Sequence, residues 1–251
     1  MSSKDIRSIL SGGVKKVSGT KSSTVNSLIT TKGKLLNDIA SEPLWRTHGT
    51  YLITNLPPKS SLIKTFGNDT KIKIAAFDLD GTLVQTKSGR SFAISSDDWK
   101  WWDSPKAKSS VLEKLDQVIK DKYLIVIFTN QGGVVTNVAN KSYNNFVKRV
   151  TSVIKSLNAY IKNEEVPILV YASPKKPAKE TDSTKHTLMR KPNIGMWKEL
   201  VEYVGNNQID EDNSFFVGDA AGRPNDFSDS DLMFAKNIGI TNFKTPEEFF
   251  L

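Results

Sequence analysis

Four short apolar runs recur along the chain from about residue 43 onward, and polar residues follow each of them. Their hydrophobicity is continuous rather than alternating, which is typical of strands that are buried on both faces of a sheet. The runs are Ile72–Phe77, Tyr123–Phe128, Ile168–Ala172 and Ser214–Val217. We therefore predict that these four segments are strands of one buried sheet.

Segments with a helical pattern separate the apolar runs. Their apolar residues recur at spacings of three and four, which predicts amphipathic helices over Ser109–Lys120, Tyr143–Ile161 and Ile194–Val204. Strands that alternate with helices predict an α/β fold with a doubly wound parallel sheet. Ligands bind such sheets beyond the carboxyl ends of the strands, so the residues just after each run are the first candidates for a site.

The beginning of the chain has a different composition. Residues 1–37 are rich in Ser, Thr, Gly and Lys, and they contain 7 Lys/Arg but a single acidic residue, Asp5. A segment with so few apolar residues cannot bury enough surface to fold alone. A Ser-rich, acid-poor start also occurs in transit peptides, although arginines are sparse here. We predict a basic, flexible segment over residues 1–42 and one globular domain over residues 43–251.

The overall composition excludes several kinds of chemistry. The chain has no cysteine, which rules out a disulfide framework, a thiolate zinc site and a cysteine nucleophile. No run approaches the roughly 18 apolar residues of a membrane span, so we expect no membrane partner. The net charge of +8 comes mainly from residues 1–70, with 10 Lys/Arg against 4 Asp/Glu. An excess of basic residues favours nucleic acid, although a solvated surface is the commoner explanation.

Three of the predicted strands end in polar motifs. The first is followed by Asp78–Thr82 (Asp-Leu-Asp-Gly-Thr), the second by Thr129–Gly133, and the fourth by Gly218–Arg223. A single Asp-Gly pair is commonly no more than a turn. Several polar strand ends that meet at one edge of a parallel sheet instead indicate a shared site.

The order and spacing of these motifs resemble the haloacid dehalogenase superfamily. The residues that match its four motifs are Asp78, Asp80, Thr82, Thr129, Lys191 and Asp219. Over residues 45–251 the chain is more specifically similar to the polynucleotide kinase 3′-phosphatase family. Further matching stretches are Ser88–Arg90, Ser96–Trp99, Phe128–Gln131, Arg190–Pro192, Gly195–Trp197, Val217–Pro224 and Thr245–Phe250.

The resemblance implies a haloacid-dehalogenase-like, Rossmann-like fold with a small hairpin flap and no large cap domain. The sequence has no Gly-x-x-x-x-Gly-Lys-Ser/Thr phosphate-binding loop, and it stops at Leu251, where the kinase domain of the two-activity proteins would begin. It therefore looks like the stand-alone fungal phosphatase, and we expect no 5′-kinase activity.

The resemblance also assigns roles to individual residues. Asp78 is expected to attack phosphorus and form an aspartyl-phosphate. Asp80 is expected to give a proton to the leaving oxygen and to take one from the attacking water. Thr129 and Lys191 are expected to bind the phosphate oxygens. Backbone N–H groups of Leu79 and Asn130 are expected to add hydrogen-bond donors, and this set of residues makes up the expected phosphate site.

A divalent cation is implied as well, because an attacking carboxylate and a phosphate dianion repel each other. The family assigns Mg²⁺ to the Asp78 carboxylate, the Asp80 main-chain carbonyl and the Asp219 carboxylate, a set of hard oxygen ligands. Asp226 and Asp231 are candidates for an outer shell. Capping of a helix that begins near Ser228 is an equally good interpretation of these two acids.

An open site suits the end of a polymer. The segment between Thr82 and Thr129 has room for a small hairpin around Ser88 and Gly89, but not for a large cap. Arg90 and Arg223 are candidates for binding the substrate backbone. The lysines of 175–179 are equally well explained as a solvated loop. An aromatic cluster, residues 99–102, offers faces for base stacking, although core packing is the better interpretation.

The function that the resemblance implies is removal of 3′-phosphates at DNA nicks, gaps and breaks, leaving a 3′-hydroxyl. We expect a nuclear, monomeric DNA-repair enzyme. Two alternatives stay open: a phosphatase of the same fold that acts on another phosphomonoester, and a non-catalytic protein that binds DNA ends. The intact pair Asp78 and Asp80 argues against the second alternative.

Overall fold

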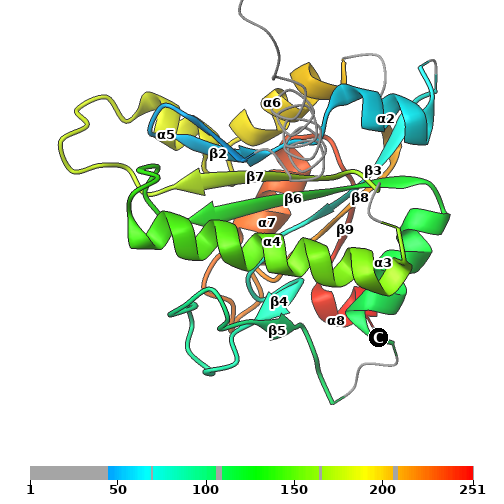
Figure 1. Ribbon diagram of the computed structural model, residues 1–251, viewed down its shortest axis with the longest axis horizontal. Coiled ribbons are helices and arrows are strands. Elements are labelled where there is room, and N and C mark those ends of the chain that lie inside the picture. The colour runs from blue at the N-terminus through cyan, green and yellow to red at the C-terminus, as the bar shows by residue number, and fades with distance from the viewer. Residues whose placement is uncertain (1–44, 69, 106–108, 164–165, 206–208, 251) are drawn as a thin grey trace, which may run out of the picture. The chain divides into compact units, whose positions relative to one another are not determined.

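The computed structural model describes residues 45–68, 70–105, 109–163, 166–205 and 209–250 (Figure 1). The basic segment predicted over residues 1–42 therefore lies outside the described residues. No described helix is long and apolar enough to cross a membrane.

A seven-stranded sheet forms the centre of the structure, with the strand order β1-β2-β7-β6-β3-β8-β9. The strands are β1 (Trp45–His48), β2 (Leu52–Asn55), β3 (Ile72–Phe77), β6 (Tyr123–Gln131), β7 (Ile168–Pro174), β8 (Ile209–Val217) and β9 (Asn242–Lys244). The five strands from β7 to β9 are parallel, and the β1–β2 hairpin adds an antiparallel edge next to β7. The prediction of an α/β fold with a parallel sheet is confirmed.

The central strands are apolar on both faces because each face meets its own layer of helices. In β3, Ile74 and Ala76 pack into one core, whereas Ala75 and Phe77 pack into the other. This double burial explains why the run is continuously apolar.

Two helical layers cover the sheet (Figure 1). One face carries α3 (Val111–Lys120), α4 (Lys141–Ile161) and α8 (Pro246–Phe250). The other carries α2 (Lys59–Phe66), α5 (Thr184–Met189), α6 (Gly195–Val204) and α7 (Ser230–Asn237). The three predicted helices are present as α3, α4 and α6. Helix α3 begins one residue after Ser110, whose side chain forms a capping box with Glu113.

A two-stranded hairpin lies between β3 and α3. It pairs β4 (Val84–Gln85) with β5 (Lys100–Trp101), and their connecting loop contains the predicted Ser88–Gly89 turn. The carboxylate of Asp98 fixes this loop: it accepts hydrogen bonds from the Ser88 N–H at 2.8 Å, the Ser88 hydroxyl at 2.8 Å and the Ile94 N–H at 3.1 Å. Within the described chain this hairpin is the whole insertion between β3 and α3, as expected for a small flap.

The tryptophans of this region pack in or against the core and do not form a platform for base stacking. Trp102 is buried, and Trp99 and Trp101 pack against the same core. The Trp101 ring N–H donates to the Ser156 hydroxyl at 3.2 Å. Among the described residues, the most exposed large apolar side chains are instead Phe92 and Phe227, which are 83% and 81% exposed.

Candidate active site

The parallel sheet brings three polar strand ends to one edge. Strand β3 lies between β6 and β8, so the residues that follow these strands converge. Asp78 comes directly after β3, and its N–H donates to the Val217 carbonyl at the end of β8, at 2.9 Å. Thr129 lies near the end of β6, and Asp219 follows β8. The predicted grouping of motifs beyond the carboxyl ends is present.

Lys191 lies at the centre of this group and is buried. Its ammonium donates to Asp78 Oδ1 at 2.6 Å, to Asp231 Oδ1 at 2.7 Å and to the Phe128 carbonyl at 2.7 Å. Burial alone would lower the pKa of Lys191, but Asp231 and Asp78 raise it above its usual value. Lys191 is therefore a fixed cation beside the expected nucleophile.

The side chain of Asn130 holds Lys191 in place. Its amide donates to the Lys191 carbonyl at 3.1 Å, and its carbonyl oxygen accepts from the Lys191 N–H at 3.0 Å. The sequence analysis assigned only the backbone N–H of Asn130 to phosphate binding. That role and the matching one of Leu79 stay predictions, whereas the side chain has a second role as a clamp.

Three carboxylates form an acidic cluster around this lysine. One oxygen from each of Asp78, Asp219 and Asp231 lies within 4.8 Å of the others. Burial raises the pKa of Asp78 well above its usual value, with further increases from Asp231 and Asp219 that Lys191 opposes. Burial, followed by the charge of Asp231, raises the pKa of Asp219 to about 6. One ammonium does not balance three carboxylates, so the site favours an additional cation.

The donor set and the packing fit Mg²⁺, which takes hard oxygen ligands. Two glycines make room for the carboxylates. Gly81 has φ +84, and a Cβ on it would lie 2.2 Å from Asp219 Oδ2. A Cβ on Gly218 would lie 2.5 Å from Asp231 Oδ2. Any other residue at either position would displace a carboxylate of the cluster.

The two candidate outer-shell acids separate in the structure. Asp231, on α7, joins the acidic cluster and also accepts a hydrogen bond from the Ala220 N–H at 3.1 Å. Asp226 lies outside that cluster. Its carboxylate accepts from the Ala221 N–H at 3.1 Å and from Arg223 Nε at 2.9 Å, so it shapes the loop after β8. Neither acid caps α7, because the N-cap residue is Asp229.

Asp80 follows Asp78 by two residues and has its own partners. Arg149 of α4 contacts both carboxylate oxygens, and Gln131 Nε2 donates to Oδ2 at 2.7 Å. The sequence analysis missed both partners. One signal was available: Arg149 is a charged residue on the apolar face of a predicted helix. Gln131 stands in the strand-end motif after Thr129, but its type did not indicate a role.

The two predicted backbone-binding arginines differ in their surroundings. Arg223 is already paired: its guanidinium donates to Asp226, to Glu247 Oε2 at 3.0 Å and to the Asp219 carbonyl at 3.2 Å. Arg90 is exposed in the β4–β5 loop, and its guanidinium has no partner among the residues that the structure describes. Substrate binding by either arginine stays a prediction, and of the two only Arg223 already contacts a residue of the acidic cluster.

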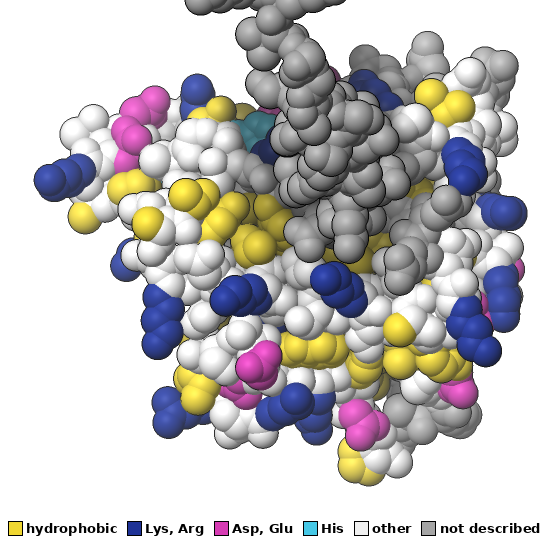
Figure 2. All heavy atoms as spheres, viewed as in Figure 1, with side chains coloured by type: hydrophobic (Ala, Val, Ile, Leu, Met, Phe, Trp, Pro, Cys, Tyr) yellow, Lys and Arg dark blue, Asp and Glu magenta, His cyan; other side chains and the backbone are white. Residues whose placement is uncertain are grey.

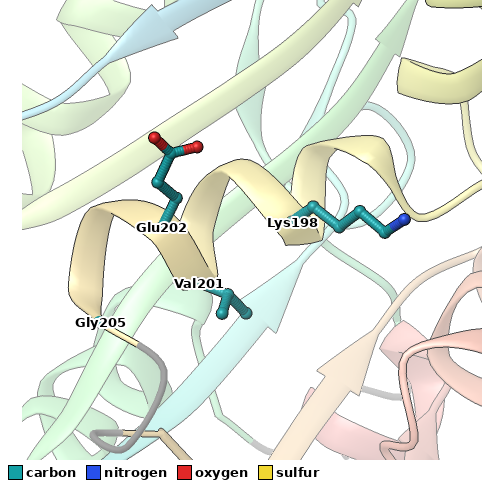
Figure 3. A pocket seen from close by; sticks show the side chains of 4 residues that line it. All are labelled: Lys198, Val201, Glu202 and Gly205. Carbon is teal, nitrogen blue, oxygen red and sulfur yellow. The ribbon is translucent and has the colours of Figure 1, made fainter.

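Elsewhere, the surface of the described residues offers little that points to chemistry. Lys and Arg side chains are scattered over the face seen in Figure 2 rather than gathered in one patch. A hollow along α6 is lined by Lys198, Val201, Glu202 and Gly205 (Figure 3). It shares no residue with the acidic cluster. We assign it no function.

Comparisons with known proteins agree with the geometry of the strand ends. A family model described as polynucleotide kinase 3 phosphatase matches residues 73–250. A bifunctional polynucleotide phosphatase/kinase from Schizosaccharomyces pombe is 41% identical over 179 residues, which cover 71% of this chain and 38% of the relative. A polynucleotide 3′-phosphatase from Saccharomyces cerevisiae is 33% identical over 212 residues, covering 71% of this chain and 87% of the relative. The chain thus spans less than half of the bifunctional relative and most of the budding-yeast one.

A solved structure supports the fold. The crystal structure of a putative haloacid-dehalogenase-like phosphatase from Mesorhizobium loti has a TM-score of 0.52 and 18% sequence identity, and the match covers 80% of this chain and 81% of that one. At this identity the likeness concerns the fold alone.

Proposed function

Because the chain belongs to the polynucleotide kinase 3 phosphatase family, we propose that it converts 3′-phosphate ends of DNA into 3′-hydroxyl ends. The observation that carries this proposal is the arrangement around Asp78. Its carboxylate lies against the Lys191 ammonium at 2.6 Å, inside a cluster of acids, with Asp80 two residues further along the chain. This arrangement supports the roles of nucleophile for Asp78, fixed cation for Lys191 and separate proton-transferring group for Asp80 at one edge of the sheet.

The first half of the reaction transfers the phosphoryl group to the enzyme. An Asp78 carboxylate oxygen attacks phosphorus, and the bond between phosphorus and the sugar 3′-oxygen breaks. Asp80 gives its proton to that oxygen, so the DNA leaves with a 3′-hydroxyl. Lys191 and the Thr129 hydroxyl donate to the phosphoryl oxygens, whose charge shifts during transfer.

The second half regenerates the enzyme. Water attacks the phosphorus of the aspartyl-phosphate, Asp80 takes the proton of that water, and inorganic phosphate leaves with Asp78 again a free carboxylate. The sum is one ester and one water converted into one alcohol and one phosphate. Asp80 thus returns to its protonated starting form, and no further reactant is needed.

We propose Mg²⁺ as the cation of the acidic cluster. The Asp78 and Asp219 carboxylates would hold it, together with the Asp80 main-chain carbonyl, and Asp231 would support it from the adjoining helix. When bound, the ion offsets the repulsion between the nucleophile and the phosphate dianion. Burial and neighbouring carboxylates raise the pKa values of Asp78 and Asp219, so a cation that stabilises their ionised forms would be favourable here.

DNA ends are the proposed substrate for two reasons. The names of the relatives specify polynucleotide 3′-phosphatases. In addition, the described insertion after β3 is only a small hairpin, which leaves the carboxyl ends of the strands accessible to a polymer end. Since the 251 residues contain no Walker-type loop, we propose phosphatase chemistry alone for this chain.

The test is a phosphate-release assay that compares oligonucleotides with a 3′-phosphate and with a 5′-phosphate, made of DNA and of RNA. We expect release from the 3′-phosphorylated DNA with Mg²⁺ and none from the 5′-phosphorylated strand. The matched control is the Asp78→Asn protein, which keeps the side-chain volume and should be inactive. Comparable release from 5′-ends, or from small phosphomonoesters alone, would contradict the proposal.

Location and assembly are further proposals. A DNA substrate and the basic N-terminal composition support a nuclear location, and we propose separately that the protein acts as a monomer. Imaging of a fluorescent fusion tests the first, and light scattering coupled to size-exclusion chromatography tests the second.

A further inference from the structure

Arg149 is a buried cation with no role in the reaction described so far. It lies on the inner face of α4, where the neighbouring inward side chains include Phe146, Val150 and Val153. Its side chain is only 6% exposed. Burying a guanidinium is costly unless the charge is paired, so the partner indicates why an arginine stands in an otherwise apolar stripe.

The partner is the Asp80 carboxylate. Arg149 Nη1 contacts Oδ1, and Nη2 lies 3.2 Å from Oδ2. Gln131 Nε2 donates to Oδ2 from the end of β6, at 2.7 Å. A guanidinium that meets both oxygens fixes the plane of the carboxylate as well as its position, and the amide adds a constraint from a second element.

The same amide connects Asp80 to the phosphate site. Gln131 Nε2 also donates to the Thr129 hydroxyl, at 2.8 Å. Arg149, Asp80, Gln131 and Thr129 therefore form one continuous hydrogen-bonded chain from α4 to the residue expected to bind phosphate. A displacement of the guanidinium would be transmitted to the group that exchanges the proton.

A purely stabilising role explains this pair less well. Buried ion pairs contribute little net stability, and an apolar residue at position 149 would match the face of α4. The pair is also asymmetric: the Asp80 side chain is 35% exposed, whereas Arg149 is 6% exposed. The cation thus lies behind a carboxylate that faces the open side of the site.

We propose that Arg149 is a positioning residue, which holds Asp80 from behind in the orientation for proton transfer. The inference rests on the proposed phosphatase function and adds the residue that orients its acid–base group. In that orientation Asp80 gives its proton to the sugar 3′-oxygen and then takes one from water. Small errors in the placement of a reacting group are costly, so loss of the guanidinium should slow turnover even though Arg149 touches no substrate.

The test compares substrates that differ in their need for a proton. The sugar 3′-oxygen leaves poorly unless it is protonated, whereas p-nitrophenolate leaves as a stable anion. For Arg149→Met we expect kcat for phosphate release from a 3′-phosphorylated oligonucleotide to fall by about 100-fold, with little change in KM. The first turnover of p-nitrophenyl phosphate should still give a burst of about one equivalent of nitrophenol, since that step needs no acid.

Two controls separate positioning from general damage. Lys148→Met makes the same charge change at an exposed position one residue earlier on α4 and should leave all rates unchanged. The double variant Arg149→Met/Asp80→Asn should give the nitrophenol burst at the same rate as Asp80→Asn alone, because Arg149 acts through Asp80. A residue that merely stabilises the fold would add its effect to that of Asp80→Asn.

Arg149→Lys keeps the experiment decisive if the methionine variant does not fold. A lysine preserves the charge but offers a point contact instead of a two-pronged one. We expect it to reduce kcat on the oligonucleotide by about tenfold and to keep the full nitrophenol burst. The inference is overturned if a folded variant keeps the wild-type kcat on the oligonucleotide, or if its oligonucleotide kcat and its nitrophenol burst fall by the same factor. It is also overturned if the effects of Arg149→Met and Asp80→Asn on the burst add. A wild-type protein that releases no phosphate would instead refute the proposed function itself.

Discussion

Removing the charge of Asp219 should stabilise the metal-free protein. Burial and Asp231 raise the pKa of Asp219 to about 6 in the folded state, whereas the ordinary value is 3.8. A difference of about 2 pKa units corresponds to roughly 3 kcal/mol at about 1.4 kcal/mol per unit, so the ionised group opposes folding by that order at neutral pH. Asp219→Asn removes the charge at constant volume. In EDTA at pH 7.5 we expect it to raise the free energy of unfolding by about 2–3 kcal/mol.

The sign of the pH dependence follows from the raised pKa. The folded state binds the proton more tightly, so Asp219 destabilises the protein fully above pH 6, and the penalty disappears as the pH falls toward 3.8. Urea denaturation at pH 7.5 and pH 4 should therefore show an advantage of Asp219→Asn at the higher pH alone. Mg²⁺ should stabilise the wild type and not the variant.

Asp226→Asn is the matched control, because it makes the same change in the same loop. Hydrogen bonds from Arg223 lower the pKa of Asp226, so its charge favours folding, and the variant should be less stable at pH 7.5. If Asp219→Asn were less stable than the wild type in EDTA, the charge of Asp219 would not oppose folding. The argument for a cation at this site would then fail.

Three further predictions concern activity and binding. Asp78→Asn and Asp80→Asn should each abolish 3′-phosphatase turnover while the circular-dichroism spectrum stays that of the folded protein. Fluoroberyllate should raise the melting temperature of the wild type but not of Asp78→Asn, and substantial turnover of folded Asp78→Asn would exclude the covalent route. Phe92→Ala and Phe227→Ala should each weaken binding of a single-stranded oligonucleotide by about 1–3 kcal/mol and leave p-nitrophenyl phosphate turnover unchanged, as measured by fluorescence anisotropy, because exposed rings stack on bases. Deletion of residues 1–37 should keep activity on short oligonucleotides within about a few-fold but weaken filter binding to long DNA, mostly at low salt; lost turnover would place this segment in the active site.

The strands at the centre of the sheet were predictable because each of them is a continuous apolar run in the sequence. The edges of the sheet carry no such signal. Strand β1 is four residues long and contains Arg46 and His48, and its place is set by pairing with β2 rather than by its composition. The first half of β8 contains the polar run Asp210–Asn213, which is typical of a turn. Only Asp210 of this run pairs with β3, opposite Lys73, and the register shifts before pairing resumes between Ala75 and Phe215. Contacts between distant segments decide both cases, and a local pattern does not contain them.

The candidate site divides in the same way. Residues at or just beyond the ends of parallel strands, such as Asp78, Thr129 and Asp219, were predictable, because neighbouring parallel strands end at one edge of a sheet. Lys191 follows none of these strands directly, and the resemblance to a family indicated it. Asp231 was one of two outer-shell candidates, and only its contacts in the structure separate it from Asp226. Arg149 belonged to neither group. A charged residue on the buried face of a helix indicates a buried partner, but the partner depends on which part of the sheet the helix covers.

The placement of charge explains why this site needs so many supporting residues. Three carboxylates lie within 4.8 Å of one another, and one buried lysine donates to two of them. Such a cluster is unfavourable for folding, so its presence in the folded chain argues for a function that uses it. Asp80 has a different requirement: its carboxylate must keep one orientation while its proton leaves and returns. The two carboxylates have different cationic partners. Lys191 binds Asp78 within the acidic cluster, whereas Arg149 of α4 binds Asp80. Two carboxylates that are two residues apart can therefore act as a nucleophile and as an acid–base group in one reaction.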